Sequence, residues 1–255
     1  MINILTWNIK AGQNKDGSYP IKKTKNLNRI AEIVRDYGAS IVCLQEVDAY
    51  TLRSGLIHQA KYIAHKLTLL TGRPWKYEYI VSRNMKPGYH GNAILSYYPM
   101  DVILKVPLTR INDRENRSFL LTSIYVGGLS IYVGTFHLGL KGDQSFQAKK
   151  IKNVLKDKYS NEIVVLAGDL NAEEGSKAYY IMRYQGPPML DAGPMGVCTL
   201  NCYDNYNNPK IDFFFVRGLS TYSLKAQVLA VDISDHRPIQ LKEILRTSNI
   251  NHAYR

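Results

Sequence analysis

The chain has 255 residues, 45% of them hydrophobic, and its 33 Lys and Arg residues outnumber 21 Asp and Glu residues. This size and composition predict a globular protein with one domain over residues 1–245. No run of about 18 apolar residues occurs, which excludes a membrane-spanning helix, and no signal peptide is visible at the N-terminus. We therefore expect a cytoplasmic protein, a monomer with no stable membrane association.

The net charge of +12 creates a positive field that attracts polyanions such as nucleic acid or anionic head groups. A basic surface that serves only solubility remains the alternative. The charge suggests a class of partner and leaves the reaction open.

The three cysteines are odd in number, and Cys43 lies inside an apolar run, so no disulfide framework is predicted and a reducing compartment fits best. Cys198 and Cys202 would suit a pair or half a zinc site. No second pair stands at zinc-finger spacing, so we interpret both as incidental structural residues.

Apolar runs with strand character recur along the whole chain, near 2–7, 40–45, 77–82, 92–97, 101–106, 119–126, 130–136, 162–167, 211–216, 224–231 and 238–242. Helical spacing appears between them in three sets: Leu27, Ile30, Val34 and Tyr37; Leu56, Ala60, Ile63, Leu67 and Leu70; Ala148, Ile151, Val154 and Leu155. Many strands and few helices predict a layered α+β protein with helices outside the sheets. Residues 246–255 read as a polar C-terminal tail.

Four polar motifs each follow an apolar run: Thr6-Trp7-Asn8, Leu44-Gln45-Glu46, Gly168-Asp169-Leu170-Asn171 and Ser234-Asp235-His236-Arg237-Pro238. Any one of them alone is more typical of a turn or a helix cap. Together they indicate one site at the rim of the sheets. Hydrolysis of a phosphodiester needs a hard metal ion, and Asn8, Glu46 and Asp235 offer the oxygen ligands that Mg²⁺ prefers.

The same motifs supply candidate acids, bases and phosphate ligands. His236 needs an acceptor to orient it, and Asp212 stands in an apolar strand where an unpaired charge is costly, so we expect the two to pair. An edge-strand position facing solvent is the alternative for Asp212. Asp169 suits the orientation or deprotonation of water, and Asn171 suits binding of the phosphate.

His137 ends another apolar run and is a candidate for the same phosphate, although a lone histidine there is more often a core or turn residue. Arg117 would clamp an anion or be an ordinary surface arginine. The segment from Arg73 to His90 mixes cations with aromatic residues and suits stacking of bases. Alternatively, Trp75, Tyr77 and Tyr79 form one buried face of a strand.

These motifs, with Gly91-Asn92-Ala93 and Thr135-Phe136-His137-Leu138, resemble the endonuclease/exonuclease/phosphatase superfamily, which contains DNase I, abasic endonucleases and neutral sphingomyelinases. The resemblance runs from Thr6 to Pro238. It implies a four-layer α/β/β/α sandwich of two mostly antiparallel sheets with helices outside. It also implies Mg²⁺ or Mn²⁺ held by Glu46, Asn8 and Asp235.

By the same resemblance, His236, Asp169, Asp212, His137 and Asn171 are catalytic, and Asn92, Arg117, Asn171 and His137 bind substrate. A histidine at position 137 resembles the DNase I and sphingomyelinase branches, whereas abasic endonucleases carry tyrosine there. We therefore expect a metal-dependent nuclease that cleaves nucleic acid, DNA in the first place, with weak sequence specificity. A sphingomyelinase-like or small-molecule phosphohydrolase is the alternative, and a non-catalytic binder is a third reading.

Overall fold

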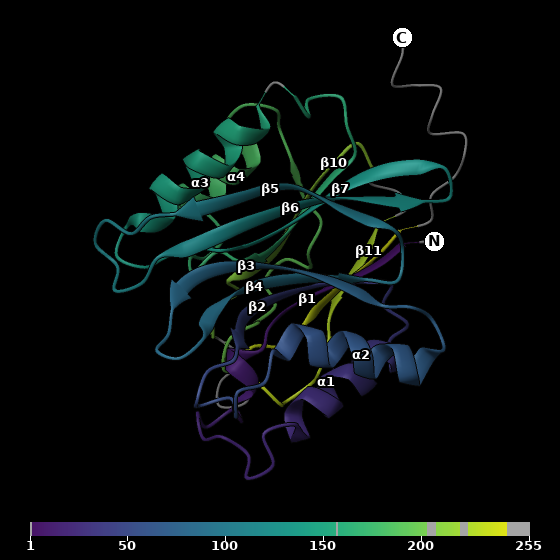
Figure 1. Cartoon of the computed structure of the whole chain (residues 1–255). Coiled ribbons are helices and arrows are strands. Elements are labelled where there is room, and N and C mark those ends of the chain that lie inside the picture. Colours follow the sequence, from purple (N-terminus) through teal and green to yellow (C-terminus); the bar gives the residue numbers. More distant parts are fainter. Residues whose placement is uncertain (1, 157, 203–207, 220–223, 244–255) are drawn as a thin grey trace.

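The computed structural model describes residues 2–156, 158–202, 208–219 and 224–243. The polar tail expected at residues 246–255 lies outside the described residues. Two six-stranded sheets pack face to face, with two helices on the outer face of each, which confirms the predicted four-layer sandwich (Figure 1). No described helix is both long and apolar enough to cross a membrane.

The first sheet has the strand order β11-β12-β1-β2-β4-β3. Its strands are β1 (Ile2–Asn8), β2 (Ile41–Ala49), β3 (Lys76–Asn84), β4 (Tyr89–Ser96), β11 (Lys225–Val228) and β12 (Ile239–Glu243). The second sheet has the order β5-β6-β7-β8-β10-β9. Its strands are β5 (Met100–Leu108), β6 (Arg117–Val126), β7 (Leu129–His137), β8 (Val164–Asp169), β9 (Leu190–Asp191) and β10 (Asp212–Arg217).

Helices α1 (Lys25–Asp36) and α2 (Gln59–Thr71) cover the first sheet, and α3 (Asp143–Leu155) and α4 (Lys177–Tyr184) cover the second. A short 3-10 helix, η1 (Lys10–Gly12), follows β1. Every predicted apolar run overlaps a strand. The expected inclusion of Leu56 in the second helix was wrong, because this residue is 54% exposed in the loop before α2.

The sequence patterns missed α4 and β9. Helix α4 has eight residues, and its clearest signal is local: Ser176 is the N-cap, and its hydroxyl accepts a hydrogen bond from the Tyr179 amide. Strand β9 has two residues, which is too short for any alternation to appear.

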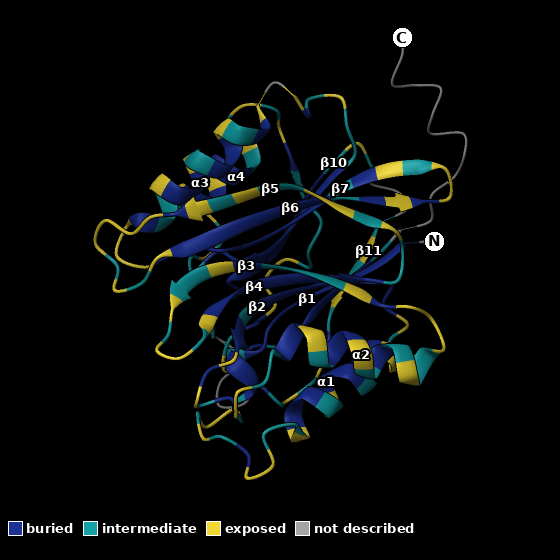
Figure 2. Cartoon of the chain, viewed as in Figure 1, coloured by how far each residue is buried: buried dark blue, intermediate teal, exposed yellow. Residues whose placement is uncertain are grey.

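The apolar core forms three layers, as the burial colours of Figure 2 show. Leu27, Ile30 and Ile63 pack between the first sheet and its helices, and Phe136, Ile151 and Phe213 between the second sheet and its helices. The layer between the two sheets contains Ile4, Ile94, Leu120, Val133 and Phe214.

Each sheet contains one central parallel pair, β1 with β2 and β7 with β8, and all other pairs are antiparallel. Parallel strands end at the same edge of a sheet. Asn8 therefore ends β1 opposite Gln45 of β2, and His137 ends β7 opposite Asp169 of β8. Packing the sheets face to face brings both pairs of strand ends to one rim.

Phe214 lies between the sheets with no exposed surface, so Phe214→Ala should lower the free energy of unfolding by about 3–5 kcal/mol through the cavity it leaves. Phe146 on α3 is 50% exposed, and Phe146→Ala is the matched control, with an expected change within about 0.5 kcal/mol. Urea unfolding of both variants checks this. Equal losses would show that Phe214 does not support the contact between the sheets.

Candidate active site

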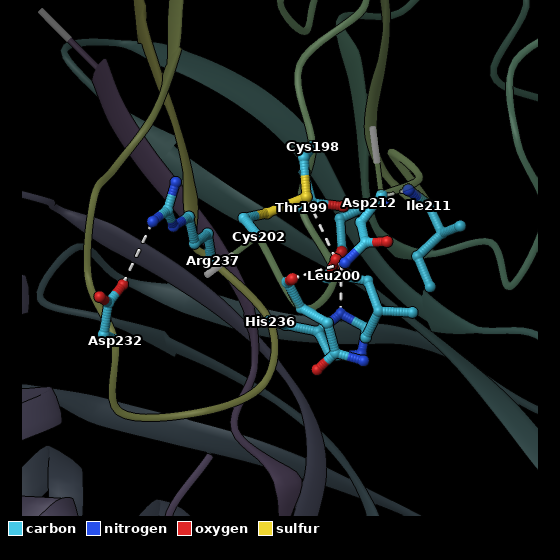
Figure 3. Close-up of a disulfide and its surroundings, with 11 residues drawn as sticks. Cys198, Thr199, Leu200, Cys202, Ile211, Asp212, Asp232, His236 and Arg237 are labelled. Carbon is cyan, nitrogen blue, oxygen red and sulfur yellow. Dashed lines mark hydrogen bonds and ion pairs between the residues drawn. A yellow bond between two sulfur atoms is a disulfide. The ribbon is translucent and has the colours of Figure 1, made fainter. Parts of the chain in front are cut away.

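A buried histidine–carboxylate pair stands at the rim. Nδ1 of His236 lies 2.9 Å from Oδ2 of Asp212, and both side chains are almost fully buried (Figure 3). Asp212 begins β10 in the second sheet, whereas His236 precedes β12 in the first. The predicted pairing of these two residues is therefore present, and it joins the two sheets.

The segment that contains His236 is fixed to the first sheet by two hydrogen bonds. The Trp7 indole N–H donates to the His236 carbonyl at 2.9 Å, and the Ser234 hydroxyl donates to the Asn8 carbonyl at 2.8 Å. Trp7 is fully buried, so the ring serves as a rigid anchor. The Thr6-Trp7-Asn8 motif thus supports the histidine as well as supplying Asn8.

Asn8 connects two carboxylates that come from different sheets. Its Nδ2 donates to Glu46 Oε1 and to Asp169 Oδ2, each at 3.0 Å, and its Oδ1 accepts the Lys10 amide at 3.1 Å. Glu46 sits in a β2 bulge with a left-handed φ of 55°, which turns its side chain out of the strand alternation toward the rim. The structure brings Asn8, Glu46 and Asp169 together.

His137 and Asn171 lie on the other side of Asp169. Asn171 Nδ2 is 2.9 Å from His137 Nε2, and the same His137 atom is 3.5 Å from Asp169 Oδ2. Asn171 takes a left-handed φ of 49°, and its backbone N–H donates to Asp169 Oδ1 at 2.8 Å. His236 Nε2 stands 3.8 Å from Asp169 Oδ2, so Asp169 is the centre of the group.

The other predicted residues have different surroundings. Asp235 Oδ2 accepts a hydrogen bond from the Lys10 ammonium at 2.7 Å. Asn92 is buried and donates to the carbonyl and hydroxyl of Ser118, which links β4 to β6. Arg117 is nearly buried, paired with Asp113 at 3.3 Å, and 3.5 Å from His137 Nδ1. It is not a surface arginine, and substrate binding by Asn92 and Arg117 stays a prediction.

The charges of the site shift several pKa values. Burial, and then the negative charge of Asp212, raises the pKa of Asp169 to about 7. Burial acts to lower the pKa of His236, but the charge and hydrogen bond of Asp212 outweigh it and raise that pKa to about 10. Burial, and then Arg117, holds the pKa of His137 well below its ordinary value. One histidine is therefore a cation at neutral pH and the other is neutral.

The donor set suits a hard divalent cation. Asp169, Asp212 and His236 place ligand atoms within 4.8 Å of one another, and the buried Oδ1 of Asp212 has no hydrogen-bond partner. His236, protonated and bonded to Asp212, is a proton donor rather than a ligand. The carboxylate oxygens of Glu46, which lies beside Asn8, suit a hard divalent cation better than a histidine nitrogen does. The ligand set predicted from Glu46, Asn8 and Asp235 stays a prediction.

A second carboxylate network beside Glu46 was missed from the sequence. Asp48 is fully buried and accepts two hydrogen bonds from Arg53, at 2.7 and 2.8 Å, and one of 2.7 Å from His90. Burial opposes its ionisation, but these bonds lower the pKa of Asp48 to about 2. The network fixes the loop after β2 at the rim. In the sequence, this network is indicated only by an aspartate, Asp48, followed five residues later by an arginine, Arg53.

Two other sequence interpretations change. Cys198 and Cys202 form a disulfide with Cα atoms 5.7 Å apart, so treating them as incidental was wrong. The odd cysteine count misled because Cys43 is buried alone in β2. Trp75 is buried, and Tyr77 and Tyr79 pack against the core under α2, so this face belongs to the core rather than to a base-stacking surface.

A family model described as the endonuclease/exonuclease/phosphatase family matches residues 5–236. The chain belongs to this family. The match begins within β1, covers the strands from β2 to β11 and includes the whole group of residues around Asp169. The members of the endonuclease/exonuclease/phosphatase family are hydrolases that act as phosphoesterases.

The individual proteins that resemble this chain have low sequence identity to it. The uncharacterized protein YbhP of Escherichia coli K12 is 29% identical over 151 residues, which cover 57% of this chain and 58% of that protein, less than two thirds of its length. A family protein from Leptotrichia buccalis has a TM-score of 0.75 at 18% identity, covering 96% of this chain and all of that one. A mannosyl-6-phosphatase from Bacteroides thetaiotaomicron has a TM-score of 0.67 at 19% identity, with coverage of 96% and 100%. At such identities the structures show the shared fold.

Replacing Asp212 with Asn should lower the pKa of His236 from about 10, because burial remains while the largest of the effects that oppose it, the charge of Asp212, is gone. The folded-state pKa of His236 is raised, so its ion pair adds stability fully below pH 6.5, and this stability is lost as pH rises toward 10. NMR titration of the His236 ring in the metal-free protein measures the shift. A pKa near 10 in Asp212→Asn would contradict the assigned cause.

Proposed function

We propose that this protein is a divalent-metal-dependent phosphodiesterase that hydrolyses nucleic acid, with DNA as the expected substrate and Mg²⁺ or Mn²⁺ as the ion. The observation that carries the chemistry is Asp169, a carboxylate with a pKa near neutrality, surrounded by Asn8, His137, Asn171 and His236. A proton acceptor works best when its pKa lies near the working pH. Asp169 would accept the proton of the attacking water.

The neighbours of Asp169 would bind the phosphate and the leaving group. His236, kept protonated by Asp212, would donate a hydrogen bond or a proton to a phosphoryl or leaving oxygen. Asn171 and the neutral His137 would position the phosphate. A bound divalent cation would neutralise charge on the phosphoryl oxygens.

Nucleic acid as the substrate is supported by the net charge of +12 and by a basic groove near the site. This groove, of about 650 Å³, runs between the start of α1 and Asp232–Ile233, two residues before Asp235. The exposed cations of its wall are Lys15, Lys22, Lys25 and Arg29, and the wall also contains the acids Glu32 and Asp232. A phosphate backbone leaving the site would meet these cations.

A lipid phosphodiester is the second candidate. Tyr50, Leu52 and Leu56 are exposed on the loop that follows β2, and Ile111 and Leu140 are exposed on loops next to Arg117 and His137. The three loops adjoin the ends of β2, β6 and β7, which carry residues of the site. Exposed apolar side chains on both sides of a phosphoesterase site suit an amphiphilic substrate.

Asp169→Asn should slow metal-dependent nicking of supercoiled plasmid by about 1,000-fold, because the amide cannot accept a proton from water. The assay compares the two proteins with Mg²⁺, with Mn²⁺ and with EDTA. Equal nicking by both would indicate a contaminating nuclease. Intact plasmid, together with turnover of a choline phospholipid in vesicles, would replace nucleic acid by lipid as the substrate.

The paired change Lys22→Glu and Lys25→Glu should raise KM for plasmid and lower the slope of log KM against log salt concentration by about 1 for each lysine lost. The matched control is Lys149→Glu with Lys156→Glu, two exposed lysines of α3 and its C-cap on the far side of the sandwich. The control should keep the original slope. If both pairs behave alike, net charge rather than this groove binds the substrate.

A further inference from the structure

The disulfide Cys198–Cys202 closes a short loop. Both cysteines are buried, with 8% and 3% of their surface exposed. Of the three residues inside the loop, Thr199 and Leu200 lie beside Asp212 and His236 (Figure 3), and Asn201 bonds to Asp235. The loop belongs to neither sheet. Its contacts are with the two chain segments that supply the histidine–carboxylate pair.

Toward the second sheet, Thr199 holds the start of β10. Its hydroxyl accepts hydrogen bonds from the amides of Ile211 and Asp212, at 3.0 and 3.2 Å, and its side chain has no exposed surface. The Thr199 amide in turn donates to the Pro209 carbonyl at 3.1 Å. The backbone of Asp212 is thereby tied to one threonine of the loop.

Toward the first sheet, the same loop holds the segment around His236. The Arg237 amide donates to the Thr199 carbonyl at 2.7 Å, and the Asn201 amide donates to the Asp235 carbonyl at 2.7 Å. Leu200 and His236 form an antiparallel bridge between these two bonds. The residues on both sides of His236 are therefore fixed to the loop.

This arrangement bears on the pair because its members belong to different sheets. Asp212 moves with β10, while Trp7 and Ser234 fix His236 to β1. Thr199 alone forms hydrogen bonds with the segment that carries Asp212 and with the segment that carries His236. A shift of the loop therefore changes the distance between Asp212 and His236. Catalytic geometry has a tolerance of a fraction of an ångström.

We propose that the disulfide-closed loop 198–202 positions the pair: Thr199, held in place by the Cys198–Cys202 bond, sets the Asp212–His236 contact, and reduction of that bond slows turnover. Thr199 and the cysteines are positioning residues and touch no reacting atom. The effect on turnover rests on the proposed function, whereas the effect on the contact between Asp212 and His236 does not.

The hydroxyl arm uses three variants. Thr199→Val removes the acceptor of both amides at nearly constant volume, and kcat should fall by about 10- to 100-fold with KM changed by less than about threefold. Thr199→Ser keeps the acceptor and should restore kcat. Thr122→Val, which removes a buried hydroxyl of β6 that donates to the Val133 carbonyl of β7, is the control for a lost hydrogen bond away from the site. An unchanged kcat in folded Thr199→Val would overturn the proposal.

The disulfide arm uses the wild-type chain. A water-soluble trialkylphosphine reduces the S–S bond: the phosphine takes an oxygen from water to become its oxide, and the two hydrogens go to the Cys198 and Cys202 thiols. Turnover should fall as in Thr199→Val and recover on reoxidation. Cys198→Ser with Cys202→Ser should be slow at the start and insensitive to the phosphine, which excludes an effect through buried Cys43. Full activity of the reduced wild type would overturn the proposal.

A readout without turnover separates this proposal from the proposed function. In the wild type, the proton between His236 Nδ1 and Asp212 should give a low-field NMR signal that persists in Thr199→Ser and Thr122→Val. It should shift or disappear in Thr199→Val and in the reduced protein. If no phosphodiester is hydrolysed, the proposed function fails while this signal still decides the role of the loop. An unchanged signal in both altered states would show that the loop does not position the pair.

Discussion

The hydrogen bonds from Asn8 to Glu46 and Asp169 are the interaction on which the site depends. One amide holds two carboxylates that belong to different sheets: Asp169 is almost fully buried and Glu46 is half-buried. Without this donor, the buried Asp169 would lose one of the hydrogen bonds that favour its charged form. Burial and the charge of Asp212 raise the pKa of Asp169 to about 7, while the hydrogen bond from Asn8 acts to lower it. That balance is what gives the carboxylate a proton affinity useful in catalysis.

The sheet topology explains why these groups meet. The central parallel pairs, β1 with β2 and β7 with β8, end at one edge, so residues from distant parts of the chain converge without long loops. Gln45 fastens the sheets beneath them, because its amide donates to Thr6 in the first sheet and to Thr135 in the second. The chemistry therefore rests on rigid strand ends.

Strands and their end motifs were readable from the sequence because alternation and burial are local signals. Asp212 shows why the main pairing was also predictable: a carboxylate between apolar neighbours needs a partner, and His236 was the histidine placed to supply one. Lys10 was not predictable as the partner of Asp235, since their contact depends on a left-handed turn after β1 and on sheet packing. The disulfide was missed because it too depends on the folded chain: the number of cysteines does not say which two of them face each other.

The core chemistry does not choose the substrate, since Asp169, His236 and Asn171 would treat any phosphodiester alike. Selection must come from the rim, where two kinds of surface compete. The groove with Lys22, Lys25 and Arg29 favours an extended polyanion, whereas exposed Tyr50, Leu52 and Leu140 favour an apolar tail. Electrostatic attraction acts over about 8–10 Å at physiological salt and weakens as salt rises, whereas apolar contact does not. Ionic strength is therefore the variable that separates the two modes of recognition in this fold.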